Sequence, residues 1–193
     1  MRLFPRLSPT ATILALYLLG VSLPARAIAL NGIIGTWGVQ LHSRFTVQGY
    51  GQRDFSGSGN CRITLRDTLN AGFSCATLDG RPDQNYSGGL TALTQARKVH
   101  WSLDAAGLDR VKANLDAFLV ARNLKRGILL TPGNISYEFH AFKYRPIRLS
   151  KDLDQPQTAS ALIKGRVVQL ANGKYTVKPF TYQLTIRFLA RVP

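Results

Sequence analysis

The chain has 193 residues, with 25 Lys and Arg against 10 Asp and Glu, so its formal net charge is +15 at pH 7. This length is enough for one domain, and the lack of internal repeats, low-complexity tracts and linkers in the sequence excludes a repeat array or a string of domains. The positive charge favours anionic partners such as phospholipid head groups, lipopolysaccharide, acidic polysaccharide or nucleic acid, with a merely solvated basic surface as the alternative.

Residues 1–27 have the pattern of a secretory signal peptide. Arg2 and Arg6 precede an apolar run over 11–23, and a short Ala-Arg-Ala sequence then ends at Ala27, after which we expect cleavage. The apolar run is shorter than the roughly 20 residues that a membrane-spanning helix needs. The sequence therefore predicts bacterial export to the periplasm or beyond, and a single β-rich domain over residues 28–193.

Strand patterns begin soon after this segment. Apolar residues at odd positions from Trp37 to Val47 alternate with mostly polar residues, which predicts one long strand with a buried face. A stretch rich in Gly and Ser follows over 49–60, and we expect it to turn.

The two cysteines predict the next hairpin. Cys61 and Cys75 are the only cysteines in the chain, and in an exported protein such a pair is read first as a disulfide. In an antiparallel pair, Cys61 opposite Cys75 also places Ile63 opposite Phe73. One register therefore closes the disulfide and matches the apolar faces.

Two further strands and a helix are predicted in the middle of the chain. The strands cover about 85–93 and 96–103, after which the apolar period changes to that of a helix over about 104–126. Asp104 is a suitable N-cap and Gly127 a suitable C-cap. The apolar stripe of this helix must pack over one side or one end of the sheet.

The remaining chain returns to strands. Apolar residues change face near Ala141, which predicts a bulge. Asn172-Gly173 is a strong signal for a two-residue hairpin turn. Both strands of that last hairpin change phase near Gly165 and Pro179, and we expect a bent corner there.

These elements add up to about eight strands in a single curved antiparallel sheet, with one amphipathic helix over about 104–126. Closure into a barrel would remove the exposed sheet edges, and about eight strands leave room inside for side chains or one small ligand. A partly open sheet wrapped on the helix is the competing architecture. The predicted fold class is mainly β, as a barrel or half-barrel.

The two ends of the domain share a short motif. Gly35-Thr36-Trp37 begins the first predicted strand, and Arg187 and Arg191 lie on the last one. This resembles the calycin superfamily, the lipocalins and avidins, in which a Gly-x-Trp on the first strand meets an Arg from the last strand. The resemblance implies a calycin-like barrel, structural roles for Trp37 and for Arg187 or Arg191, and a ligand in the apolar interior.

The sequence has none of the common catalytic motifs. It contains no G-x-S-x-G elbow, no H-E-x-x-H, no phosphate loop and no G-x-G-x-x-G, and its three histidines fall on polar faces of predicted strands. We therefore predict no enzymatic activity, no cofactor and no metal site. No nucleic-acid-binding module is recognisable, so a membrane or envelope surface is the preferred anionic partner. The oligomeric state stays open.

Two sets of residues are candidate contacts. Large apolar residues would line a pocket for a lipid or other apolar small molecule, or would simply fill a dry core: Trp101, Tyr137, Phe139, Tyr182, Leu184 and Ile186. A cation-rich stretch interleaved with aromatic residues would contact an anion: Lys143, Arg145, Arg148 and Lys151.

The leading hypothesis is an exported, non-enzymatic binding protein that holds an apolar or amphipathic ligand inside the barrel. The alternative is a basic cell-envelope protein that docks on an anionic membrane, a polysaccharide or a protein partner and has no internal ligand.

Overall fold

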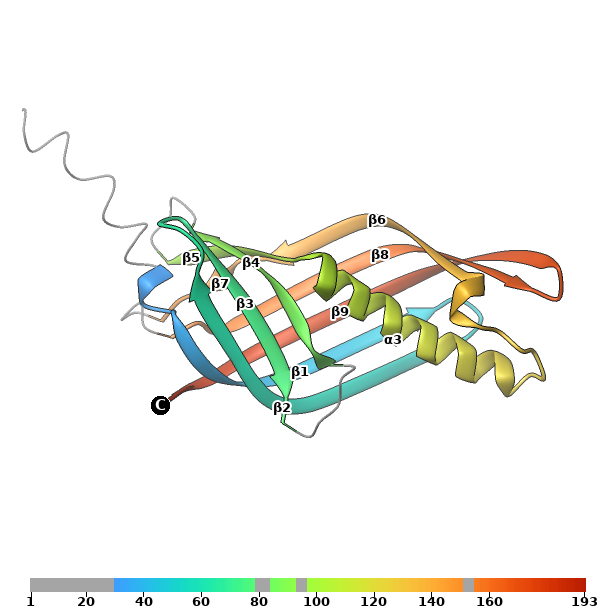
Figure 1. The fold of residues 1–193 in the computed structure, drawn as a ribbon, viewed down its shortest axis with the longest axis horizontal. Helices are drawn as coiled ribbons and strands as arrows, with labels where there is room; N and C mark the ends of the chain where they lie inside the picture. Colours follow the sequence, from blue (N-terminus) through green and yellow to red (C-terminus); the bar gives the residue numbers. More distant parts are fainter. Residues whose placement is uncertain (1–29, 79–83, 93–96, 151–154) are drawn as a thin grey trace, which may run out of the picture.

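The computed structural model describes residues 30–78, 84–92, 97–150 and 155–193, so the predicted signal peptide and Lys151 lie outside the described residues. Nine strands form one antiparallel sheet in the order β6-β8-β9-β1-β2-β3-β4-β5-β7 (Figure 1). In chain order they are β1 (Gly35–Val47), β2 (Gly51–Leu65), β3 (Asn70–Thr77), β4 (Tyr86–Ala92), β5 (Lys98–Leu103), β6 (Ile135–Arg145), β7 (Ile147–Arg148), β8 (Thr158–Ala171) and β9 (Lys174–Val192). Helix α3 (Ala105–Leu124) and the short 3₁₀ helix η2 (Pro132–Asn134) lie between β5 and β6.

The sheet closes on itself through one run of chain. β6 pairs with β8, and after Pro146 the same run continues as β7, which pairs with β5. Proline has no N–H to offer to a ladder, so the chain changes its pairing partner at this residue. The result is a nearly closed antiparallel barrel, which confirms the predicted fold class. The strand count is nine rather than about eight because Pro146 divides this run in two.

Strand β2 starts earlier than the sequence predicts. The turn expected over 49–60 is wrong for most of that stretch, because residues 51–60 belong to β2 and pair with β1. The chain reverses over residues 48–50 instead. A Cβ atom on Gly59 would lie 1.8 Å from the carbonyl oxygen of Ala76 in β3, so this glycine allows close approach of a strand and not a reversal.

The hairpin of β2 and β3 has the register that the cysteines predict. Cys61 lies opposite Cys75, Ile63 lies opposite Phe73, and the disulfide is formed. Disulfides are typical of proteins from oxidising compartments. The bulge predicted in β6 is also confirmed, because its register against β8 shifts at residues 139–141.

Strands β8 and β9 pair continuously, from Ala171 opposite Lys174 to Thr158 opposite Arg187. The turn lies at Asn172 and Gly173, whose φ angles are 50° and 70°, as the Asn-Gly signal predicts. The register does not slip where the apolar pattern changes phase. Side chains alternate between the two faces along an unbroken strand, so the apolar residues move from one face of the sheet to the other where the pattern changes. Those nearest the turn lie on the outer face.

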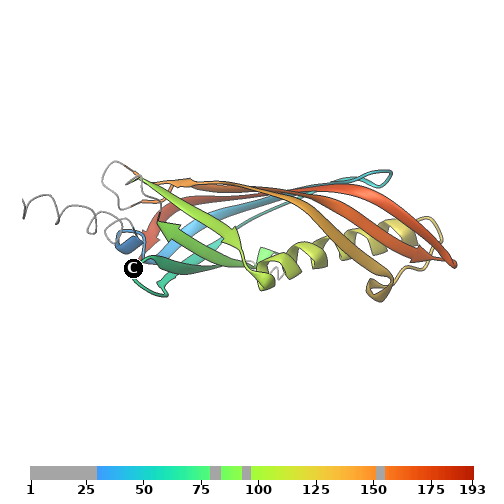
Figure 2. The same ribbon diagram turned by 90° about the horizontal axis from the view of Figure 1, so that it is seen from above.

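Helix α3 begins after the predicted N-cap Asp104 and ends at Leu124, with Lys125 rather than Gly127 as its C-cap. The side chain of Asp104 accepts a hydrogen bond of 2.9 Å from the backbone N–H of Gly107, and Gly127 follows the last turn with a φ of 72°. Phe118 on the buried face of the helix meets Phe45 of β1 edge to face, with ring centroids 5.2 Å apart. Figures 1 and 2 show the helix along the concave side of the sheet. Within the described residues, no helix has both the length and the apolar character that a bilayer crossing requires.

Candidate functional site

The interior of the barrel is filled by side chains. Four of the six predicted pocket residues are buried, with exposed fractions of 1 % or less: Trp101, Tyr182, Leu184 and Ile186. The cavity that Trp101 and Ile186 line together measures about 10 Å³. A single water molecule needs roughly 10–15 Å³, so a cavity of this size has no room for a lipid or another apolar ligand. These four residues pack as a core in this structure, and their role as ligand contacts stays a prediction.

The other two predicted pocket residues join β6 to its neighbours. Tyr137 and Phe139 are half-buried, and both rings meet Phe180 of β9 edge to face, with centroids 6.0 and 5.8 Å away. The hydroxyl of Tyr137 donates a hydrogen bond of 2.6 Å to the carboxylate of Asp116 on α3. Burial raises the pKa of Asp116, and the hydrogen bond from Tyr137 offsets part of that rise. The six predicted residues therefore do not surround one common cavity.

Sequence reasoning missed a buried polar cluster between α3 and the sheet. The amide nitrogen of Asn114 donates hydrogen bonds to the hydroxyls of Tyr86 and Tyr182, over 3.1 and 2.7 Å. The two hydroxyls are themselves 2.5 Å apart. Burial is the main reason why the pKa of Tyr86 lies well above its ordinary value, so the cluster is uncharged. The signal that could have revealed it is the polar Asn114 within the apolar stripe of the helix.

The calycin resemblance implies a contact between Trp37 on the first strand and an Arg on the last strand. The structure has this contact, and the Arg is Arg191. The guanidinium carbon of Arg191 lies 5.0 Å from the centre of the Trp37 ring, and its Nη2 atom donates to the carbonyl oxygen of Gly32 over 2.6 Å. Arg187 is exposed and pairs across the sheet with Gln40 instead. Arg191 therefore ties the last strand to the start of the barrel, which is a structural role.

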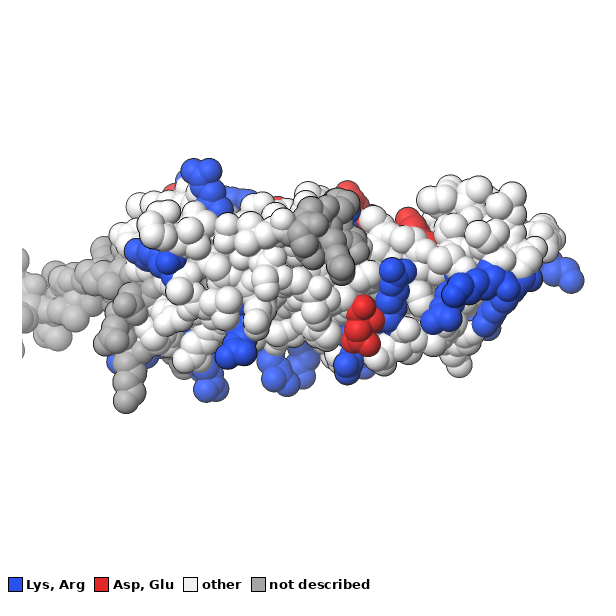
Figure 3. All heavy atoms as spheres, turned by 90° about the horizontal axis from the view of Figure 1, so that it is seen from below, with Lys and Arg blue, Asp and Glu red and all other residues white. Residues whose placement is uncertain are grey.

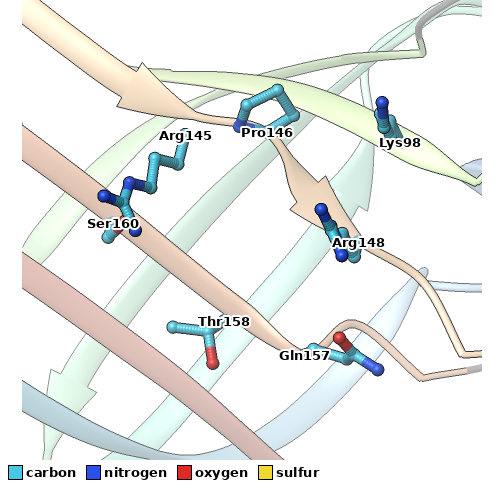
Figure 4. A pocket seen from close by; sticks show the side chains of 7 residues that line it. All are labelled: Lys98, Arg145, Pro146, Arg148, Gln157, Thr158 and Ser160. Atoms are coloured by element: carbon cyan, nitrogen blue, oxygen red, sulfur yellow. The ribbon is translucent and has the colours of Figure 1, made fainter.

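The surface carries many more cations than anions, and Figure 3 shows this excess on one face of the molecule. Several of these cations line one pocket. A pocket of about 490 Å³ lies where β6 passes into β7, and we call it the seam pocket (Figure 4). It is lined by Lys98, Arg145, Pro146, Arg148, Gln157, Thr158 and Ser160.

An interruption of the strand ladder marks the seam pocket. The pairing of β6 with β8 ends at Arg145 opposite Ser160. Pro146 follows, and the next backbone hydrogen bond runs from Gln157 to the carbonyl oxygen of Arg148, over 3.0 Å. Between these two points the ladder is interrupted, and the pocket lies beside this gap. Lys98 reaches the same place because it lies opposite Arg148 in the pairing of β5 with β7.

The lining residues face outward, away from the core. Arg148 and Thr158 are exposed, whereas the residues next to them in β7 and β8, Ile147 and Ala159, are buried on the inner side; Arg145 is exposed as well. No described carboxylate forms an ion pair with Arg145 or Arg148. Figure 4 shows the side chain of Arg145 lying toward Ser160, with Lys98 and Arg148 along the opposite part of the rim. A guanidinium group in such a position can donate two parallel hydrogen bonds to a phosphate or carboxylate.

The structure brings together part of the predicted anion contact. Arg145 and Arg148 share the seam pocket, and Lys143 lines an adjoining depression of about 260 Å³ that shares Arg145 and Ser160 with it. Lys98 was missed because its pairing with Arg148 depends on how the barrel closes. Among the described residues, no three His, Cys, Asp or Glu side chains cluster so that they could hold a metal ion.

Comparisons with known proteins identify no family. No protein-family model matches the chain, and no curated protein matches it. One similar solved structure is described as EF1p2_mFAP2b bound to DFHBI; it is 15% identical, covers 82% of this chain and 97% of that chain, and has a TM-score of 0.32. Another is a redesigned beta barrel that is 13% identical over 87% of this chain and 96% of that chain, with a TM-score of 0.31. Likeness at this level carries no functional argument, so the function has to be argued from the barrel and its seam pocket.

Proposed function

We propose that this chain is an exported, non-enzymatic binding protein that recognises an anionic group in the seam pocket. The observation that carries the proposal is the convergence of Lys98, Arg145 and Arg148 on one outward pocket of about 490 Å³. Cations that share a concavity focus their field and attract a multivalent anion more strongly than the same charges on a flat face. The excess of basic over acidic residues adds a long-range attraction for the same kind of partner.

Phosphate on an envelope lipid or sugar is the ligand class that fits this lining. The two guanidinium groups supply forked donors, Lys98 supplies a point charge, and the hydroxyls of Thr158 and Ser160 can donate to further oxygens. The described lining is made mainly of cationic, amide and hydroxyl side chains, which suits the binding of an anion. The disulfide and the predicted signal peptide support export.

An apolar ligand inside the barrel is the weaker candidate. The interior cavity of about 10 Å³ would have to expand greatly, by movement of α3 or of the core side chains around Trp101. Moving close-packed side chains apart forfeits dispersion contacts that the ligand would then have to replace. The seam pocket needs no such rearrangement.

Isothermal titration calorimetry with inorganic phosphate, with pyrophosphate and with glucose as the uncharged probe tests the proposal. We expect wild-type protein to bind pyrophosphate more tightly than phosphate, and not to bind glucose. The double substitution Arg145→Ala and Arg148→Ala removes two charge-assisted donors and weakens pyrophosphate binding by at least tenfold, on the order of the 1.5–3 kcal/mol that one such hydrogen bond contributes.

A control variant distinguishes binding in the seam pocket from attraction by the overall charge. Lys164→Ala with Arg166→Ala removes two exposed cations of β8 that do not line the seam pocket. We expect this control to bind pyrophosphate within about twofold of wild type, because screened distant charges contribute little. Equal weakening in both double variants would overturn the proposal, since binding would then follow net charge alone.

A further inference from the structure

The end of the molecule farthest from β5 and β7 has a surface of a different kind. Figures 1 and 2 show that the β1–β2 turn, the β8–β9 turn and the C-terminal end of α3 all lie at this end of the long axis. We call it the distal end, and it comprises residues 48–50, 122–134 and 168–178. A hydrogen bond of 2.7 Å from Arg126 to the carbonyl oxygen of Gly49 joins the helix end to the β1–β2 turn.

Large apolar side chains protrude from the distal end. Leu129 is 78% exposed, Tyr175 73%, Leu124 62% and Val177 52%. Scattered single apolar residues are normal on a protein surface, but a group of them at one end marks a contact surface. Two of the four belong to the chain around the end of α3, and the other two belong to the β8–β9 hairpin.

The hairpin residues form a continuous patch. Leu170 lies opposite Tyr175, and Val168 lies opposite Val177, so the four side chains are cross-strand neighbours on one face. That face is the outer one, because the alternating residue Gln169 is buried on the inner side. Val168 and Leu170 are half-buried and Tyr175 and Val177 are exposed, so the described chain covers this apolar face only in part.

The two segments that carry these apolar residues also carry cations and contain no acidic residue. Residues 122–134 include Arg122, Lys125 and Arg126, residues 168–178 include Lys174 and Lys178, and neither segment contains an Asp or Glu. Figure 3 shows Lys and Arg side chains grouped near this end, beside uncharged surface. The distal end therefore combines protruding apolar side chains with basic residues and offers no matching negative charge.

We propose that the distal end docks on the surface of an anionic phospholipid bilayer. Tyr and Leu side chains at a protruding end can enter the boundary between head groups and acyl chains, where the tyrosine hydroxyl stays hydrated. The long Lys and Arg side chains reach the phosphates at the same time. Charge complementarity selects an anionic bilayer over a neutral one. This site lies away from the seam pocket, so docking leaves that pocket open to a ligand.

Co-flotation of the full chain with lipid vesicles tests the docking site. We expect binding to vesicles of phosphatidylglycerol with phosphatidylcholine, weaker binding to phosphatidylcholine alone, and release by salt. Tyr175→Ser with Val177→Ser removes apolar area and lowers partitioning by about tenfold. Lys125→Gln with Lys174→Gln lowers binding to the anionic vesicles and reduces its salt dependence. All variants carry the same N-terminal segment, so any binding by that segment is equal among them.

A control variant and a tryptophan fluorescence measurement complete the test of the docking site. Lys164→Ala with Arg166→Ala, two exposed cations outside both the distal end and the seam pocket, is the matched control, and we expect it to bind vesicles as wild type does. Tyr175→Trp adds an exposed indole to a chain whose Trp37 and Trp101 are buried, and its emission shifts to the blue with anionic vesicles. Vesicle binding that is unchanged in both distal double variants overturns the proposal. So does vesicle binding that Arg145→Ala with Arg148→Ala removes while both distal double variants keep it, because the seam pocket would then hold the lipid.

Discussion

Replacing Asn114 by Leu tests whether the buried polar cluster holds α3 on the sheet. The amide of Asn114 donates to two tyrosine hydroxyls, Tyr86 over 3.1 Å and Tyr182 over 2.7 Å, and the side chain is 2 % exposed. Leu has the same branching and the same number of side-chain heavy atoms as Asn, so the substitution removes the donors and leaves no large cavity.

The expected loss follows from the two hydrogen bonds. Each contributes about 1 kcal/mol net, and each tyrosine oxygen that loses a partner in the core adds part of a desolvation cost of roughly 1–3 kcal/mol. The hydroxyls keep their contact with one another, at 2.5 Å, which limits that cost. We therefore expect the free energy of unfolding to fall by about 2–4 kcal/mol, a large part of the 5–15 kcal/mol typical of a domain.

Urea denaturation followed by tryptophan fluorescence and by circular dichroism measures this loss. Ala113→Leu at the neighbouring exposed position of α3 is the control, and we expect it to change stability by less than about 0.5 kcal/mol. A triple variant that also carries Tyr86→Phe and Tyr182→Phe should recover part of the loss, because the two hydroxyls that lose the amide donor are then absent. If Asn114→Leu is as stable as wild type, the cluster does not anchor the helix and the reasoning is refuted.

Three other predictions concern the sheet and one half-buried carboxyl. Cys61→Ser with Cys75→Ser opens a loop closed across 14 positions and lowers the free energy of unfolding by about 3 kcal/mol; an unchanged urea midpoint would contradict this. Gly59→Ala places a Cβ atom 1.8 Å from a carbonyl oxygen of β3 and should prevent normal folding, whereas Gly89→Ala, with no atom within 4 Å, should fold with wild-type circular dichroism. Burial raises the pKa of Asp116, so the folded state binds this proton more tightly than the unfolded state does. Its stabilising contribution is present below the ordinary pKa of 3.8 and is lost as the pH rises through the raised value. Asp116→Asn should therefore stabilise the protein at neutral pH by less than about 1 kcal/mol, and the gain should vanish in acid; a gain that grows in acid would contradict this sign.

Local patterns in the sequence were sufficient for most of the secondary structure. Three local patterns act within a few residues of their own position: the alternation from Trp37 to Val47, the N-cap Asp104 and the Asn172-Gly173 turn. Their physical causes are steric and hydrogen-bonding preferences of the local backbone, so no tertiary information is needed to read them. The pairing of the cysteines extended this reading to one longer-range register.

A local pattern can have more than one tertiary cause, and the turn expected over 49–60 was wrong for this reason. Glycine permits both a reversal of the chain and the close approach of a strand, and only the neighbours of Gly59 decide between them. The change of apolar phase in the last hairpin has two causes as well, a slip in register or a change of the buried face. The continuous pairing of β8 with β9 shows that it is a change of face.

The sequence by itself therefore determined the β-rich fold, the helix, the disulfide pairing and the cationic stretch with Arg145 and Arg148. Only the tertiary structure decided that the interior is filled and that Lys98 joins those two residues in a pocket. The free volume inside the barrel depends on how side chains from distant strands and α3 interdigitate, and a local sequence pattern does not contain that information. The seam pocket depends on where the sheet closes, because Pro146 moves the chain from β8 to β5.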